Sequence, residues 1–392
     1  MKENNCLGNC ILCGKCYQAQ ILDFFDEPVG AGSVGRGHGF GIAIDIGTTT
    51  VVMALLDFGK SEILARHSFL NPQRVFGPDV ISRIDAANKG HLEELGGLIR
   101  DSVASNIHVL MAHKNLKPSD IAEAAVAANT TMTALLLGFP CKSLGAAPFA
   151  PDFSLAGHYR FADVFMGSEI DCPLHIMPWM AAFVGGDITS GLLFALQKNK
   201  QLFMLIDLGT NGEILLYNKG KITVTATAAG PAFEQSGKSE FSAASDVISA
   251  LAELVRQGIV DETGALENED IFSQKHVRDL QLAKSAIRSG LEILIEAGGT
   301  SYDELEKIYL AGGIGQHINI NDAVTIGLIP ESLKNKAEAV GNSSLGGAVL
   351  FLRSPEENGS CIQKLAATSV ELNLAKHPRF NECFMEFMCF EC

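Results

Sequence analysis

Basic side chains are scarce in this chain of 392 residues, which has 30 lysines and arginines against 45 aspartates and glutamates and a formal net charge of −15. A polyanion such as nucleic acid, or an anionic membrane surface, would repel that charge. Long apolar runs are also missing, because none approaches the ~20 residues that a membrane-spanning helix needs. We therefore expect neither a nucleic-acid partner nor a membrane partner.

The sequence also lacks an N-terminal signal peptide, because the cysteines from Cys6 to Cys16 interrupt the apolar core that such a peptide requires. It thus predicts a cytoplasmic protein. Apolar residues make up 47% and charged residues 19% of the chain, which is typical of a globular protein. The length suggests two or three domains, each with enough chain for a core.

Two segments of the chain, residues 42–56 and 203–217, read almost as copies of each other. Each has an apolar run, an aspartate (Asp45 or Asp207), a Gly-Thr turn and a second apolar run. A single duplication of long period predicts two similar lobes. We expect each lobe to offer one such turn to a shared ligand.

The repeated turn has the chemistry of a phosphate site. Glycine allows a bulky anion to approach the backbone, and successive N–H groups and threonine hydroxyls can cradle its oxygens. Asp45 and Asp207 would repel a polyphosphate unless Mg²⁺ lay between them, so they are the expected partners of Mg-nucleotide. The alternative is two ordinary hairpins. The expected phosphate-contacting residues are Gly47, Thr48, Thr49, Thr50, Gly209, Thr210, Asn211, Gly212 and Glu213.

Three further segments are candidates for the same site. A short apolar strand runs into Gly312, Gly313 and Gly315, which suggests a nucleoside-binding loop. Asn129 and Thr130 follow a buried strand, where α/β folds place ligand contacts, although a helix N-cap explains such residues equally well. Asp187 precedes an apolar helix, either as its N-cap or as a cleft carboxylate that orients an attacking water.

Four cysteines stand close together near the start of the chain, in the spacing C-x3-C-x2-C-x2-C. This is the bacterial ferredoxin run read backwards, and it favours a [4Fe-4S] cluster over zinc or free redox-active thiols. A glycine-rich stretch follows and is expected to act as a tether. The expected ligands are Cys6, Cys10, Cys13 and Cys16.

A second group of cysteines, Cys383, Cys389 and Cys392, lies at the other end of the chain. The group is either part of an apolar helix, in which the cysteines act as small apolar residues, or a second metal or redox site.

The glycine motifs together resemble those of the acetate and sugar kinase/Hsp70/actin superfamily. Within it, the segments Asn129-Thr130-Thr131-Met132 and Gly230-Pro231-Ala232-Phe233-Glu234 resemble the reductive activators of corrinoid proteins. The resemblance covers residues 40–390, with Gln235 standing where the family has a small residue. It implies an α/β fold, two-lobed and actin/Hsp70-like (a duplicated ribonuclease H-like fold), with Gly230, Pro231 and Glu234 in a nucleotide loop. The short cysteine segment differs from the larger [2Fe-2S] domain of those activators.

From these observations we expect five parts: an iron–sulfur cysteine segment (1–28), a glycine-rich linker (29–41), lobe I (42–200), lobe II (201–350) and a C-terminal helical segment (351–392). The resemblance implies an ATPase that uses ATP, Mg²⁺ and an iron–sulfur cluster. Its expected partners are a low-potential electron donor and, as acceptor, a corrinoid protein or another iron–sulfur metalloenzyme. A homodimer is left open. The alternative functions are a small-molecule kinase and a nucleotide-dependent switch.

Overall fold

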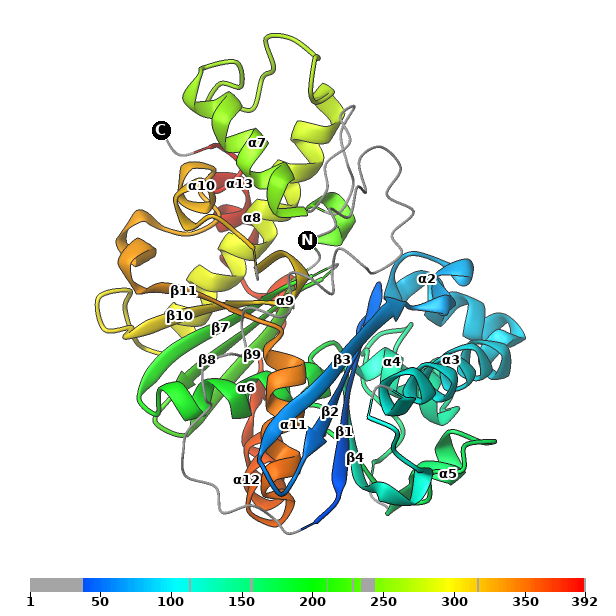
Figure 1. Ribbon diagram of the computed structural model, residues 1–392. Helices are drawn as coiled ribbons and strands as arrows, with labels where there is room; N and C mark the ends of the chain where they lie inside the picture. Colours follow the sequence, from blue (N-terminus) through cyan, green and yellow to red (C-terminus); the bar gives the residue numbers. More distant parts are fainter. Residues whose placement is uncertain are drawn as a thin grey trace, which may run out of the picture.

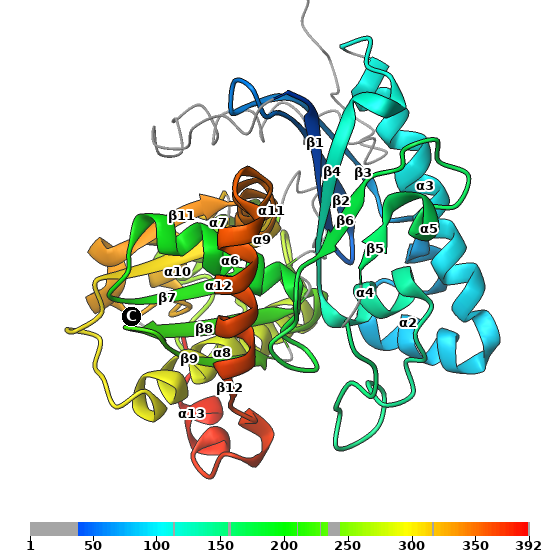
Figure 2. The same cartoon turned by 90° about the horizontal axis from the view of Figure 1, so that it is seen from below.

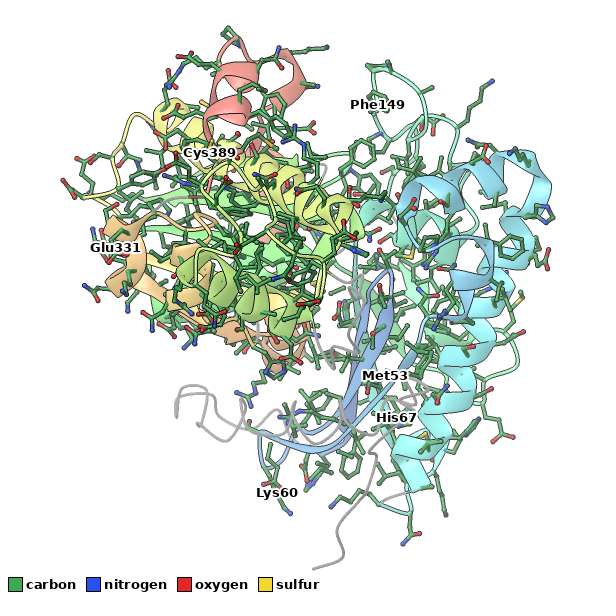
Figure 3. All side chains as sticks on the ribbon, turned by 90° about the horizontal axis from the view of Figure 1, so that it is seen from above. Met53, Lys60, His67, Phe149, Glu331 and Cys389 are labelled. Atoms are coloured by element: carbon green, nitrogen blue, oxygen red, sulfur yellow. The ribbon has the colours of Figure 1, made fainter. Side chains whose placement is uncertain are left out.

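The chain forms two mixed β-sheets that lie side by side, each with helices of its own (Figures 1 and 3). Strands carrying Met53 and His67 belong to the first lobe, and Glu331 and Cys389 lie on the second (Figure 3). The computed structural model describes residues 38–112, 114–155, 158–209, 211–227, 229–233, 244–315 and 317–390. The expected cluster ligands Cys6, Cys10, Cys13 and Cys16, as well as Thr210, Glu234 and Cys392, lie outside these ranges.

The sheet of lobe I has the strand order β3-β2-β1-β4-β6-β5. Its strands β1 to β3 form an antiparallel meander, and β4 and β6 continue it in parallel with β1. The strands are β1 (Phe40–Ile46), β2 (Thr50–Asp57), β3 (Glu62–Leu70), β4 (Ile121–Ala128), β5 (Tyr159–Arg160) and β6 (Pro173–Ile176). Their helices are α2 (Val80–Ala86), α3 (Leu92–Ala112), α4 (Thr130–Leu137) and α5 (Phe161–Val164).

The sheet of lobe II, β11-β10-β7-β8-β9-β12, repeats this plan. Strands β7 to β9 form the meander, and β10 and β11 continue in parallel with β7. The strands are β7 (Leu202–Leu208), β8 (Gly212–Asn218), β9 (Lys221–Thr227), β10 (Lys307–Ala311), β11 (Ala337–Gly341) and β12 (Val370–Glu371). The helices are α7 (Ala244–Arg256), α8 (Gln274–Ala297), α9 (Gly312–Gly315) and α10 (Ile320–Thr325).

Each sheet is covered on both faces, which explains why its central strands are nearly continuous apolar runs. In β1, Ile42 and Ile44 face the core that contains α3, whereas Ala43 faces a second core that contains α11. The same alternation occurs in β7, where Met204 and Ile206 face α8 and Phe203 and Leu205 face α6.

The two lobes exchange helices. Helix α6 (Gly186–Lys198) precedes lobe II in the chain and packs Ile188 and Leu192 on the lobe II sheet. Helix α11 (Ser343–Arg353) follows the last parallel strand of lobe II, yet it packs Leu345 and Val349 on the lobe I sheet. Both helices therefore lie between the sheets, in contact with each other (Figures 1 and 2). The boundary expected at residue 350 falls inside α11, because this helix completes the core of lobe I.

The crossing of α6 and α11 depends on residues with little or no side chain. A Cβ on Gly347 would lie 1.8 Å from the carbonyl oxygen of Ser190, and one on Gly191 would lie 2.7 Å from Ser343 Oγ. The hydroxyl of Ser190 donates a hydrogen bond of 2.7 Å to the carbonyl of Ser344. The two helix backbones are thus in direct contact.

The C-terminal segment returns to lobe II through α12 (Pro355–Thr368), β12 and the seven-residue α13 (Phe380–Glu386). Cys383 is buried against α8, as expected of a small apolar residue, whereas Cys389 is exposed. Lys284 of α8 donates a hydrogen bond of 2.5 Å to the carbonyl of Cys389. Because Cys392 is not described, a second metal site at this end stays a prediction.

In the part of the chain that the structure describes, no helix is both long and apolar enough to cross a membrane.

Substituting alanine at Gly347 tests the importance of the helix crossing. We expect Gly347→Ala to lower the free energy of unfolding by about 2–3 kcal/mol, since its Cβ meets backbone that can yield only if the helices separate. Gly359→Ala in α12 is the matched control, because its Cβ would have no neighbour closer than 3.6 Å. Urea denaturation of both variants checks this, and equal midpoints would contradict it.

Candidate functional site

Four acidic side chains from both lobes form one cluster. Asp45 lies near the end of β1, Asp207 near the end of β7 and Glu213 opposite Asp207 on β8, while Asp187 lies in the first turn of α6. The charges of Asp45 and Asp187 both raise the pKa of Asp207, and those of Asp187 and Asp207 raise the pKa of Glu213. Asp45 and Asp207, which the sequence analysis expects to share a ligand, therefore lie in one cluster, and their role as metal ligands stays a prediction.

Burial is the largest cause of the shifts in this cluster. It raises the pKa of Asp45 to about 6, against hydrogen bonds from Asn342 and Ser344 that favour the carboxylate. Burial also raises the pKa of Asp187 to about 7 and that of Asp207 to about 8, with the neighbouring aspartates adding to both shifts. The pKa of Glu213 rises well above its usual range for the same reasons. The cluster is thus poor in compensating positive charge.

A divalent cation fits this donor set. Among the described residues, no lysine or arginine forms an ion pair with any of the four carboxyl groups. Nor do those residues contain a group of three histidine, cysteine or acidic side chains that could hold a metal ion by themselves. This arrangement suits Mg²⁺, which takes only one or two carboxylates and completes its coordination with phosphate oxygens and water.

The two glycine turns face this cluster from the ends of β1 and β7. Both are closed by a backbone hydrogen bond of 3.0 Å, from the N–H of Gly47 to Thr50 and from the N–H of Gly209 to Asn211. A Cβ on Gly47 would lie 2.7 Å from the carbonyl oxygen of Thr50. The outward part of the first turn is Thr49, which is exposed, whereas Thr48 is buried and Thr50 half-buried.

The turn of lobe I is held from behind by polar residues that the sequence analysis did not single out. Arg83, fully buried, donates a 2.6 Å hydrogen bond to the carbonyl of Thr48, and burial lowers its pKa to about 10. Asn71 donates a 2.9 Å hydrogen bond to the carbonyl of Gly47. These contacts fix the backbone of the turn from the side of its carbonyl groups.

In lobe II, two glycines are required by packing. Gly212 begins β8, and its Cβ would lie 2.5 Å from the hydroxyl oxygen of Thr227. Gly312 has φ +82° and a Cβ there would lie 2.2 Å from the Asp207 carboxylate. The Gly312–Gly315 turn therefore borders the acidic cluster, and its role as a nucleoside-binding loop stays a prediction. Gly313 in this turn is exposed, and Gly230 opens a short 3₁₀ helix with φ +67°.

Asn129 and Thr130 have different roles. Asn129 is the N-cap of α4, where its Oδ1 accepts the N–H of Met132 at 2.8 Å, and its amide donates to Thr48 Oγ at 3.2 Å. It thus borders the phosphate turn. The hydroxyl of Thr130 is buried and donates to the carbonyl of Ala181 at 3.0 Å. The hydroxyl thus has a protein partner, and a contact of Thr130 with a nucleotide stays a prediction.

Asp187 is not a helix N-cap, because that position belongs to Gly185. A Cβ on Gly185 would lie 2.4 Å from Asn129 Cα, so the start of α6 is pressed against the end of β4. One carboxylate oxygen of Asp187 accepts the N–H of Ile188 at 2.8 Å. The carboxyl group belongs to the acidic cluster, which favours the cleft interpretation of the sequence.

The most informative contacts at Asp45 come from residues nearly 300 positions away. Asn342 donates its amide to Asp45 Oδ2 at 2.7 Å, and Ser344 donates its hydroxyl to Asp45 Oδ1 at 2.8 Å. Asn342 is also the N-cap of α11. The capping signal could be read from the sequence, but the exchange of helices that brings it to Asp45 could not.

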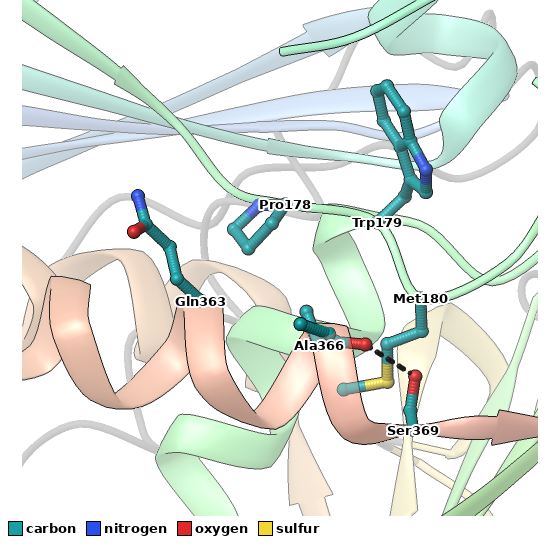
Figure 4. Close-up of a pocket in the computed structure, with 7 residues that line it drawn as sticks. Pro178, Trp179, Met180, Gln363, Ala366 and Ser369 are labelled. Atoms are coloured by element: carbon teal, nitrogen blue, oxygen red, sulfur yellow. Dashed lines mark hydrogen bonds between the residues drawn. The ribbon is translucent and has the colours of Figure 1, made fainter. Parts of the chain in front are cut away.

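A groove of about 390 Å³ lies between the segment Pro178–Met180 and helix α12 (Figure 4). Its α12 side includes Gln363 and Ala366, and Ser369 donates to the carbonyl of Ala366 at 2.7 Å. No ionisable side chain lines it, so it offers no acid–base chemistry. It does contain Trp179, the only tryptophan of the chain.

Comparison with known proteins agrees with this architecture. A family model described as the RACo middle region matches residues 40–199, and a model of the C-terminal domain of RACo, the ASKHA domain, matches residues 201–246 and 267–391. The chain belongs to the RACo family. The members of this family are reductive activators of corrinoid proteins, so both the resemblance seen in the sequence and the predicted ASKHA fold class are confirmed.

Individual RACo-like relatives support this assignment. The chain is 32% identical to the corrinoid activation enzyme RamQ of Eubacterium limosum, over 88% of this chain and 69% of RamQ. It is 23% identical to the [Co(II) methylated amine-specific corrinoid protein] reductase of Methanosarcina barkeri, over 78% and 68%. A solved reductive activator for corrinoid, iron–sulfur protein superposes with a TM-score of 0.81 at 30% identity, over 91% and 66%. The chain thus spans about two thirds of their length.

The acidic cluster predicts a pH dependence for this RACo-family protein. Its carboxyl groups have raised pKa values, so the folded state holds protons that the unfolded state has released above about pH 4. As the pH rises towards 8, the buried carboxyl groups lose these protons and the free energy of unfolding falls. Between pH 6 and 8.5 and without Mg²⁺, we expect wild type to lose roughly 1–3 kcal/mol more unfolding free energy than Asp207→Asn.

Denaturant titrations at several pH values check this expectation. Asp57→Asn serves as the control, because Asp57 lies at the opposite end of the β1–β2 hairpin from Asp45. A loss of stability that is the same in wild type and Asp207→Asn would contradict the charge cluster.

Proposed function

We propose that this chain is an iron–sulfur ATPase that couples hydrolysis of Mg-ATP to delivery of one electron to a corrinoid protein. Reductive activation of corrinoid proteins is the function of its family. The observation that carries the finer proposal is the acidic cluster, which is shared by two lobes and bordered by a glycine turn from each. A polyphosphate and its cation would bind at a site to which both lobes contribute residues.

We assign the nucleotide site to the two turns and the loops beside them. Asp45 and Asp207 would hold Mg²⁺, whose charge would offset both their carboxylates and the phosphates. The backbone at Gly47 and Gly209 would contact phosphate oxygens, with Thr49, Thr50 and Asn211 beside them. The same proposed site also includes Thr48, Asn129, Gly212, Glu213, Gly230, Gly312, Gly313 and Gly315. Three further members lie outside the described residues, namely Thr210, the side chain of Pro231 and Glu234.

Asp187 is the candidate for handling the attacking water. One of its oxygens accepts the N–H of Ile188, which fixes the carboxyl group at the start of α6. A carboxyl group with a pKa of about 7 is suited to accept a proton near neutral pH. Asp187 would orient the water and take its proton as the water oxygen attacks the terminal phosphorus.

The exchanged helices provide a route from nucleotide to electron transfer. Asp187 begins α6, which packs on the lobe II sheet, while α11 packs on the lobe I sheet. A ligand held by both lobes would therefore favour one relative position of the two helices. For one electron, each tenfold change in equilibrium corresponds to about 59 mV, so an uphill transfer of a few hundred millivolts needs several kcal/mol. Closure on ATP is the proposed source.

We assign the electron carrier to Cys6, Cys10, Cys13 and Cys16, which lie outside the described residues. Four closely spaced thiolates suit a [4Fe-4S] cluster, which would supply a one-electron carrier of low potential. A low-potential donor would reduce it. The acceptor would be a corrinoid protein whose inactive Co(II) takes up the electron, and a cytoplasmic setting suits all these partners.

Removing either metal-binding carboxylate should abolish Mg-dependent ATP hydrolysis. We expect Asp45→Ala and Asp207→Ala to lower the rate at least 100-fold while the protein stays folded, because the charge that holds the cation is lost. Phosphate release by the purified variants checks this, with Asp57→Ala as control. Near wild-type turnover in both variants would refute the assignment of the site.

Replacing two of the N-terminal cysteines should separate the two activities. We expect Cys10→Ser with Cys13→Ser to lose the bound iron and the reduction of a corrinoid acceptor, because serine is a poor ligand for the cluster. Basal ATP hydrolysis should persist, since the glycine turns are untouched. Cys361→Ser on α12 is the control, as Cys361 is a single exposed thiol. About four irons per wild-type chain are expected, and one zinc without iron would overturn electron transfer.

A further inference from the structure

We propose that Asn342 and Ser344 are positioning residues for the metal-binding carboxylate of Asp45, and that they make Mg²⁺ affinity depend on how α11 is seated between the lobes. This inference rests on the proposed nucleotide site. It concerns two side chains from the far end of the ATPase region, neither of which belongs to a phosphate turn.

The two donors fix the plane of the carboxylate. Asn342 binds one oxygen of Asp45 at 2.7 Å and Ser344 binds the other at 2.8 Å. Each carboxylate oxygen has two lone pairs, so one on each oxygen stays available for a cation or its bound water. The pair of contacts therefore orients Asp45 without occupying it.

The orientation of Asn342 is itself determined. Its Oδ1 accepts the N–H of Leu345 at 2.7 Å as the N-cap of α11, so the other end of the amide, which faces Asp45, is the NH₂ donor. Gly341 precedes it with φ +68°, a left-handed conformation that lets the chain turn from β11 into α11 within two residues. Asn342 thus lies directly between β11 of the lobe II sheet and helix α11, and both elements fix its position.

A buried hydrogen bond extends this arrangement to the second helix. The carbonyl of Ser344 accepts the hydroxyl of Ser190, which is fully buried in α6 and lies one turn after Asp187. The contact between α11 and α6 therefore determines the distance between the carboxyl groups of Asp45 and Asp187. Because the backbones touch at Gly347, a shift of one helix past the other has no side chain to absorb it. Such a shift would change the distance between these two carboxyl groups.

Variants at both donors test the inference. Asn342→Ser keeps an N-cap side chain but cannot reach Asp45 with an amide, and Ser344→Ala removes the hydroxyl. We expect each to raise the Mg²⁺ concentration for half-maximal ATP hydrolysis roughly 10-fold, the usual effect of losing a partner behind a metal ligand. The rate at saturating Mg²⁺ should stay within about threefold of wild type.

Calorimetric titration with ATP gives a readout that does not depend on turnover. Binding of ATP in EDTA should be unchanged in both variants, whereas the tightening caused by Mg²⁺ should be reduced about 10-fold. Asn319→Ser is the control, because Asn319 caps α10 in the same way but contacts no cleft carboxylate. It should behave as wild type.

The outcomes are distinguishable. Wild-type Mg²⁺ dependence in both donor variants would overturn the positioning role, as would a fall in the maximal rate without any shift in the Mg²⁺ midpoint. If wild type itself bound ATP equally with and without Mg²⁺, the proposed metal site would fail, and this inference with it.

Discussion

The structure is organised around negative charge that it does not neutralise by itself. Asp45, Asp187, Asp207 and Glu213 are brought together from two lobes, and burial with mutual repulsion raises the pKa of each. Keeping like charges close in a buried site costs stability, and no described basic side chain pairs with them. The fold is thus preorganised for a ligand that brings positive charge, which is the property expected of a Mg-nucleotide site.

The duplicated topology explains how the two lobes share this ligand. The three meander strands and the two parallel strands beside them have the same order in both sheets, so the ends of β1 and β7 carry equivalent turns. The helices that would otherwise complete each lobe are exchanged, with α6 packed on lobe II and α11 on lobe I. In the proposed function, a nucleotide held by both lobes would favour one relative position of the lobes, which is the coupling an energy-driven electron carrier requires.

Much of this could be predicted from local patterns in the sequence. Apolar runs ending in Asp-x-Gly-Thr predicted two equivalent strand-turn-strand units, and Gly312 lies close to Asp207 in the second of them. The hydrogen bond from the hydroxyl of Thr130 could not be predicted, because its partner, the carbonyl of Ala181, lies on a distant segment. Asn342 and Ser344 were missed for the same reason: helix exchange between lobes leaves no periodic signal, although the N-cap before α11 does.

In the proposed function, ATP bound between these lobes drives the transfer of an electron to cobalt. The most direct test follows the visible spectrum of a corrinoid protein in the Co(II) state, mixed anaerobically with this protein and a low-potential reductant. We expect loss of the Co(II) spectrum with Mg-ATP and no change with Mg-ADP or with ATP in EDTA. Reduction at the same rate without nucleotide would contradict it.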